Sequence, residues 1–113
     1  MKTKQILLCL LALFVSISAQ ALSFEVDGIK YTTTEGGVTV TGYNSTATNL
    51  VLNGSVTYQD VEYNVVSIGN NAFYGCSSLT SVGDLSACTS IGYQAFYNCS
   101  NLTSVGNLSA CTS

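Results

Sequence analysis

With 113 residues, the chain is long enough for one small domain and an export signal, and too short for two domains. Charged residues make up only 8% of it, against roughly 25% in an average soluble protein, and histidine, proline and tryptophan are absent. So few basic residues exclude a nucleic-acid-binding protein, and the lack of histidine excludes histidine-based nucleophilic catalysis and histidine zinc sites.

The first 21 residues have the pattern of a secretory signal peptide. Lys2 and Lys4 precede an apolar run over residues 6–17, and Ala19 and Ala21 place small residues at a cleavage site. About twelve apolar residues are too few for a membrane span, which needs roughly twenty. We therefore expect export to the cell surface or medium, cleavage after Ala21, and no membrane span in the mature chain.

Residues 22–64 have the alternating pattern of short strands. Apolar and polar residues alternate in pairs such as Phe24/Val26 and Val38/Val40, with β-branched and aromatic residues enriched. We predict a small antiparallel sheet that caps the N-terminal end of the domain. Its expected turns are the dipeptides Asp27-Gly28, Gly36-Gly37 and Asn53-Gly54.

Two 23-residue units, residues 68–90 and 91–113, follow each other without a gap and are identical at 18 of 23 positions. Within a unit, apolar residues recur mostly every third position, which fits neither a 3.6-residue helix nor a two-residue strand. A chain that coils repeatedly around one interior has this spacing, and a 23-residue period is typical of leucine-rich repeats. We predict a mainly β solenoid with Leu79-x-x-Val82 as a strand and a core ladder of Ile68/Ile91, Phe73/Phe96, Leu79/Leu102 and Val82/Val105.

The segment over residues 67–82, SIGNNAFYGCSSLTSV, resembles the BspA-like family of bacterial surface leucine-rich repeat proteins. The motif I-G-x-x-A-F-x-x-C-x-x-L-x-S-V recurs over residues 91–105. The resemblance implies a leucine-rich repeat fold, with residues 24–31 and 38–43 as strands before the array. It also implies a surface protein that binds host matrix proteins or other bacteria. Family repeats often continue with Ile-Pro, where this chain has Gly83-Asp84-Leu85.

The predicted organisation is a signal peptide over residues 1–21, a β cap over residues 22–64 and leucine-rich repeats over residues 65–113. We expect no second cap of this kind directly after the last unit. We expect either that the array continues in a longer protein, which we favour, or that the last coil is covered by self-association.

Four cysteines remain after the signal peptide: Cys76, Cys88, Cys99 and Cys111. Adjacent coils would bring Cys76 near Cys99 and Cys88 near Cys111, within the range of a disulfide. All four lie at apolar positions of the repeat, which favours buried thiols, with a bridge as the alternative. Without histidine or a Cys-x-x-Cys pair, we expect no metal and no other cofactor.

Carboxylates are the remaining catalytic candidates. Asp60 and Glu62, like Glu25 and Asp27, are two residues apart and would share a face of a strand. A hydrolase needs two carboxylates across a cleft, one of them with a raised pKa. Beside turns in a small sheet, these residues are better interpreted as edge charges that discourage aggregation. We expect no enzymatic activity.

A binding surface is the better interpretation of the polar residues. After the signal peptide, six carboxylates and one lysine leave a net charge of −5, so partners should be met by neutral and aromatic contacts. Tyrosine supplies contact area and hydroxyls supply adaptable hydrogen bonds, although they can also merely satisfy turns. We predict a protein-binding or adhesion module, with a structural envelope or spacer protein as the alternative. The candidate contact residues are Tyr74, Thr80, Ser81, Tyr97, Thr103 and Ser104.

Overall fold

The computed structural model describes residues 21–111, which form nine strands and no helix. The predicted signal peptide therefore lies outside the described residues except for Ala21. Within residues 21–111, no helix is long and apolar enough to cross a membrane. The strands are β1 (Ser23–Val26), β2 (Ile29–Thr34), β3 (Gly37–Tyr43), β4 (Leu50–Leu52), β5 (Ser55–Tyr58), β6 (Val61–Ile68), β7 (Leu79–Val82), β8 (Ser90–Ile91) and β9 (Ser104–Val105).

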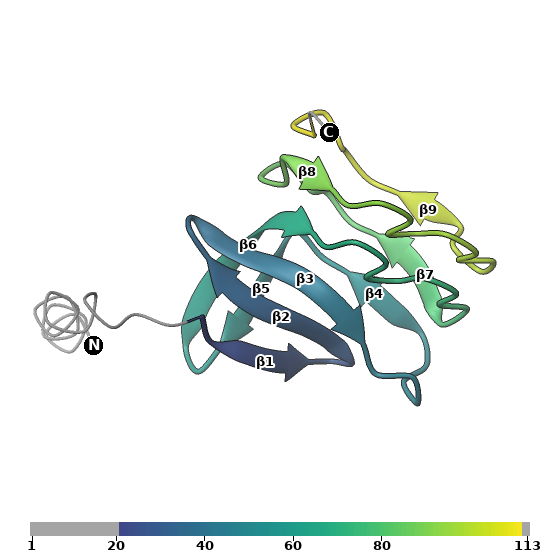
Figure 1. Cartoon of the computed structure of the whole chain (residues 1–113), viewed down its shortest axis with the longest axis horizontal. Coiled ribbons are helices and arrows are strands. Elements are labelled where there is room, and N and C mark those ends of the chain that lie inside the picture. The colour runs from purple at the N-terminus through teal and green to yellow at the C-terminus, as the bar shows by residue number, and fades with distance from the viewer. Residues whose placement is uncertain (1–20, 112–113) are drawn as a thin grey trace, which may run out of the picture.

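The N-terminal strands form one curled sheet in the order β1-β2-β3-β6-β5 (Figure 1). β1, β2 and β3 are antiparallel, as the alternating pattern predicted. The β1–β2 turn is Asp27-Gly28, whose φ angles of 51° and 85° belong to a two-residue hairpin turn. β5 and β6 form a second hairpin that was not predicted, because its turn, Gln59-Asp60, has two positive φ angles but no glycine.

Beyond this sheet the chain coils. Each coil contributes one strand to each of two ladders, and within each ladder the strands pair in parallel. β3, β6 and β8 pair in parallel on one side, and β4, β7 and β9 on the other (Figure 1). Equivalent residues of the two units meet, because Ile68 pairs with Ile91 and Val82 with Val105. The predicted solenoid with a 23-residue step is confirmed.

The coiling begins before the first complete unit. β4 pairs with β7, which places Leu50 beside Leu79. The ring of Tyr43 stacks on that of Phe73 with centroids 6.1 Å apart, so tyrosine takes the place of the ladder phenylalanine. Residues 38–52 thus supply a coil of their own. Comparison of the two units did not reveal it because this segment has neither the Ile-Gly nor the Ala-Phe pair.

The predicted ladder positions form the core of the solenoid. The rings of Phe73 and Phe96 stack nearly parallel, with centroids 5.6 Å apart and 8° between planes. A coil is fully covered only when it has a neighbour on both sides. In the first unit the buried set is Phe73, Cys76, Leu79, Val82, Leu85 and Cys88. Their equivalents in the second unit are accordingly only partly buried, except for Val105, which is 50% exposed and does not join the core as predicted.

The expectation that each carboxylate pair shares a strand face was wrong. Asp27 and Asp60 both lie in turns with positive φ, whereas Glu25 and Glu62 lie on β1 and β6. The predicted turn at Asp27-Gly28 divides residues 24–31 into β1 and β2. Neither pair of carboxylates therefore has the geometry that was expected of it.

Two of the predicted glycine turns also differ from the structure. The β2–β3 turn consists of Glu35 and Gly36, and Gly37 already belongs to β3. Asn53-Gly54 links β4 to β5, but these strands do not pair and form no hairpin. Gly54 is needed there for another reason, because a Cβ atom would overlap the carbonyl oxygen of Asp84 in the next coil.

Candidate functional site

Tyr74 and Tyr97 form an exposed row on the turn that follows each Ile-Gly pair. Each unit contains the sequence Ala-Phe-Tyr at this turn. The alanine and phenylalanine pack inward, and the tyrosine that follows them points outward. Phe73, for example, is fully buried, whereas Tyr74 and Tyr97 are each 48% exposed. The two tyrosine rings stack with centroids 5.1 Å apart and 29° between planes. The structure therefore places these two predicted contact residues side by side.

The backbone of this turn explains where the two units differ. Asn71 and Gln94 have φ angles of 59° and 55°, and Gly75 and Asn98 have φ angles of 67° and 60°. This left-handed region is open to glycine and tolerated by asparagine, and it costs most other residues free energy. At these two positions, the turn rather than a ligand restricts the choice of residue.

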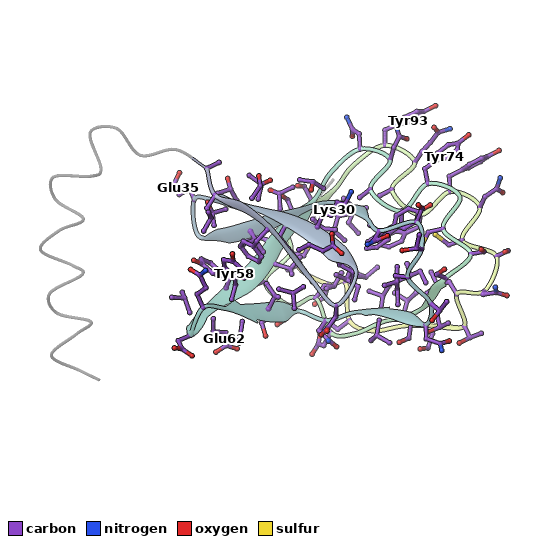
Figure 2. The ribbon with its side chains drawn as sticks, turned by 90° about the horizontal axis from the view of Figure 1, so that it is seen from below. Lys30, Glu35, Tyr58, Glu62, Tyr74 and Tyr93 are labelled. Atoms are coloured by element: carbon purple, nitrogen blue, oxygen red, sulfur yellow. The ribbon has the colours of Figure 1, made fainter. Side chains whose placement is uncertain are left out.

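A third exposed tyrosine, Tyr93, was not among the predicted contact residues. Its exposed fraction is 72%, and Figure 2 shows it projecting from the same edge of the molecule as Tyr74. Tyr93 stands where the first unit has Asn70, whose Oδ1 accepts a 2.7 Å hydrogen bond from the Tyr93 backbone N–H. The sequence did contain a signal for this exposed residue. Position 70/93 is the one place where the first unit has an amide residue and the second has an aromatic one.

Three of the four predicted hydroxyl residues lie on β7 and β9, and Thr103 immediately precedes β9. The Thr80 hydroxyl donates to the carbonyl oxygen of Leu50 at 3.1 Å, and the Thr103 hydroxyl donates to that of Thr80 at 3.1 Å. These two threonines therefore link successive coils. Ser81 pairs in register with Ser104, and neither serine hydroxyl forms a hydrogen bond within the described part of the chain.

The tyrosines and the hydroxyls form two separate rows. The tyrosine row, which consists of Tyr74, Tyr93 and Tyr97, lies on the turns after β6 and β8. The hydroxyl row lies along the β4-β7-β9 ladder, where the exposed Val51 continues it beside Ser81. No hydrogen bond or ring contact joins the two rows among residues 21–111. Both rows consist of uncharged residue types, because Asp84 is the only acidic or basic residue in the two units. The arrangement suits neutral contacts with a partner.

Residues 43–113 match the family model described as BspA type leucine-rich repeat region (6 copies). The chain belongs to this family. The match begins at Tyr43, the residue that stacks at the first position of the core ladder. The BspA-type repeat thus extends over the coil that precedes the two 23-residue units.

Solved structures of other bacterial leucine-rich repeat proteins share this fold. One from Bacteroides ovatus is 39% identical, with a TM-score of 0.64, and the match covers 79% of this chain and 24% of that one. One from Bacteroides capillosus is 28% identical, with a TM-score of 0.61 over 74% and 64% of the two chains. A leucine rich cell surface protein from Faecalibacterium prausnitzii is 27% identical, with a TM-score of 0.59 over 82% and 25%. This chain therefore spans less than two thirds of the length of each, and no curated protein sequence matches it.

Family membership identifies the chain as a leucine-rich repeat module, a class that generally mediates protein interactions. None of the matches indicates a catalytic family. Among residues 21–111, no group of three or more His, Cys, Asp or Glu side chains is placed to hold a metal ion. The tyrosine and hydroxyl rows are the predicted contact residues of this BspA-type chain.

The cysteines of the BspA-type repeat are free thiols that pack along the core. The Cys99 thiol donates to the Phe73 carbonyl oxygen at 3.1 Å, and the Cys111 thiol donates to that of Cys88 at 3.2 Å. Burial, with Cys111 beside it, raises the pKa of the Cys88 thiol to about 11. The favoured prediction of buried thiols agrees with this arrangement, in which the sulfur atoms act as small apolar groups.

We expect the folded state to lose stability as the pH rises from 9 to about 11. Cys88 has an ordinary pKa of 9.0 when unfolded and about 11 when folded, so the unfolded chain releases this proton first. Ionisation then favours unfolding, by on the order of 1 kcal/mol across this window. Urea unfolding at a series of pH values measures the decline, which should be shallower in Cys88→Ala. An equally steep decline in that variant would show that Cys88 is not its source.

Proposed function

We propose that this chain is a non-enzymatic protein-binding module of the bacterial cell surface, and that the tyrosine row is its main contact. The observation that carries the proposal is the exposure of Tyr74, Tyr93 and Tyr97, at 48%, 72% and 48%, along one edge of the solenoid. Exposed apolar patches mark interaction sites, and tyrosine is enriched where proteins bind each other. The row gives a partner a firm aromatic surface that costs little conformational entropy to order.

The hydroxyl row offers a second set of contacts. Ser81 and Ser104 present free hydroxyls, and Thr80 and Thr103 retain acceptor lone pairs beside them. Repetition of the same groups in successive coils suits a ligand that binds through many weak contacts, so that avidity replaces affinity. The resemblance to surface repeat proteins favours a host matrix protein or another bacterial surface as the ligand.

Export to the cell surface is the location that goes with this function. The N-terminal pattern of a signal peptide supports it, and one solved relative is described as a leucine rich cell surface protein. Fractionation of the producing cells, with an antibody against residues 22–113, should find the protein in the envelope. Recovery in the cytosol would contradict surface location.

A structural spacer without a ligand is the second candidate. Several repeat side chains donate hydrogen bonds to carbonyl oxygens of the preceding coil, among them Thr80, Thr103 and Asn101 at 3.1, 3.1 and 2.8 Å. Bonds of this kind would serve a spacer as well as a binding module. The tyrosines link the coils only through the stacking of Tyr74 on Tyr97, and Tyr93 is 72% exposed, so this row is the feature that favours binding.

Direct binding assays separate the two candidates. The mature chain, displayed in many copies on a sensor surface, is exposed to a panel of purified extracellular-matrix proteins. We expect at least one to bind, and Tyr74→Ser/Tyr97→Ser to weaken it by about tenfold or more. Val61→Ser is the matched control, because Val61 is 44% exposed but lies on β6 in the cap. Failure to bind any panel protein, or an equal loss in the control, would overturn the proposal.

A further inference from the structure

A small cleft opens where the curled N-terminal sheet nearly closes on itself. β1 and β5 are its two edge strands and are not hydrogen-bonded to each other. Near one end of this seam, the rings of Phe24 and Tyr58 stack with centroids 4.2 Å apart. Toward the β1–β2 turn, β1 and β5 leave a cleft of about 250 Å³ that also reaches β4. This volume is below the roughly 300–1,000 Å³ of small-molecule sites and suits a single side chain.

The cleft combines apolar walls with oxygen atoms from several elements. Ile29 and Val56 are both buried and contribute to its apolar lining. The polar residues of the lining include Asp27, Asn53 and Ser55. These groups come from the β1–β2 turn, the β4–β5 link and β5, so the fold of the cap brings them together.

Tyr31 supplies an unused polar group at this cleft. It is only 4% exposed, lines the cleft, and its hydroxyl forms no hydrogen bond with any residue that the structure describes. Burial raises the pKa of Tyr31 to about 12, and the nearby charge of Asp27 acts in the same direction. Among the described residues no side-chain oxygen is both fully buried and unpartnered, so the Tyr31 hydroxyl reaches solvent and is free to accept a hydrogen bond from a bound group.

The charge around the cleft favours a cationic group. Five of the six carboxylates beyond residue 21 lie in residues 25–62. The only lysine of this segment, Lys30, lies opposite Glu25 in the register of the β1–β2 hairpin, and its side chain is exposed between the buried Ile29 and Tyr31. Asp27 is the only carboxylate in the cleft lining, which is too few for a calcium ion with its six to eight oxygen ligands.

We infer that the cleft between β1–β2 and β4–β5 binds a primary alkylammonium group, the end of a lysine side chain of the protein partner. The inference deepens the proposed function and rests on it for the nature of the partner. The ammonium group donates to the Asp27 carboxylate and to the Tyr31 hydroxyl oxygen, while the methylene groups of the lysine pack on Ile29 and Val56. Ammonium fits better than guanidinium, because the acceptors come from separate elements rather than as one planar pair.

Titration of the ¹⁵N-labelled mature chain with n-butylammonium chloride tests the site by NMR. We expect saturable shifts at the backbone amides of Asp27, Tyr31 and Ser55, and none with butanol or sodium butyrate. Asp27→Asn keeps the size of the side chain and tolerates the positive φ, and it should weaken binding about tenfold or more. Tyr31→Phe removes only the hydroxyl and should weaken binding several-fold. Equal shifts with butanol, or unchanged affinity in Asp27→Asn, would overturn the inference.

A matched acidic control and a peptide probe complete the test. Glu35→Gln removes an equal charge at the β2–β3 turn and should leave butylammonium binding unchanged. The capped peptide acetyl-Val-Lys-Val-amide should bind, and its glutamine analogue should not. Binding of the free amine without the lysine peptide would overturn the assignment to a partner lysine. Tyr74→Ser/Tyr97→Ser should still bind butylammonium, so a failed cleft and a failed tyrosine row are distinguishable.

Discussion

Replacement of Phe73 by alanine is expected to lower the free energy of unfolding by about 4 kcal/mol. Phe73 is fully buried and lies in the middle of the aromatic ladder, where its ring stacks on Tyr43 at 6.1 Å and on Phe96 at 5.6 Å. The substitution removes the side chain that joins the cap to the repeats, and it leaves a cavity that neither ring can fill. Urea unfolding followed by circular dichroism measures the loss.

Tyr74→Ala is the matched control for this prediction. Tyr74 is the next residue on the same turn, has an aromatic ring and is 48% exposed. We expect its replacement to change stability by no more than about 1 kcal/mol, because the ring lies on the surface. Similar losses in both variants would show that the ladder is not the main source of stability.

Gly54→Ala should cost about 3 kcal/mol for a different reason. An added Cβ atom would overlap the carbonyl oxygen of Asp84, a backbone atom that cannot rotate away. The Gly54 carbonyl oxygen also accepts a 2.9 Å hydrogen bond from the Val65 N–H. The methyl group therefore forces apart the β4–β5 link and the coil that follows β7. Thermal or urea unfolding of the purified variant measures the effect.

Gly42→Ala makes the same chemical change where there is room for it. The nearest atom to an added Cβ is Cδ of Lys30 at 4.0 Å, and the φ angle of Gly42 is not positive. Alanine there should be neutral or stabilise by about 0.5 kcal/mol, because it restricts the unfolded chain. If Gly42→Ala were as harmful as Gly54→Ala, the close approach to Asp84 would not be the cause.

The repeats were predictable because their pattern occurs twice. Each apolar position is matched 23 residues later, and in a solenoid that interval becomes a physical contact, as between Val82 and Val105. The ladder and its central phenylalanines followed from this match. The coil over residues 38–52 was not predictable in the same way, since Tyr43 and Leu50 occupy ladder positions within a different local sequence.

The sequence predicted neither the β5–β6 turn nor the hydrogen bonds made by the candidate contact residues. The Gln59-Asp60 turn contains no glycine, and its two positive φ angles depend on the pairing of β5 with β6. The sequence likewise placed the tyrosines and hydroxyls in equivalent positions of each unit, but it did not show that Thr80 and Thr103 use their protons to link coils. The exposure of a side chain depends on the three-dimensional path of the coil, which a repeat alignment does not contain.

Fluorine NMR of the mature chain labelled with 3-fluorotyrosine tests whether the tyrosine row is the binding surface. The seven tyrosines lie in the cap, in the core ladder and in the exposed row, so each region has its own reporter. On addition of a matrix protein that binds the chain, we expect the resonances of Tyr74, Tyr93 and Tyr97 to shift or broaden first. If these three resonances stay unchanged while the protein is bound, the tyrosine row is not the binding surface.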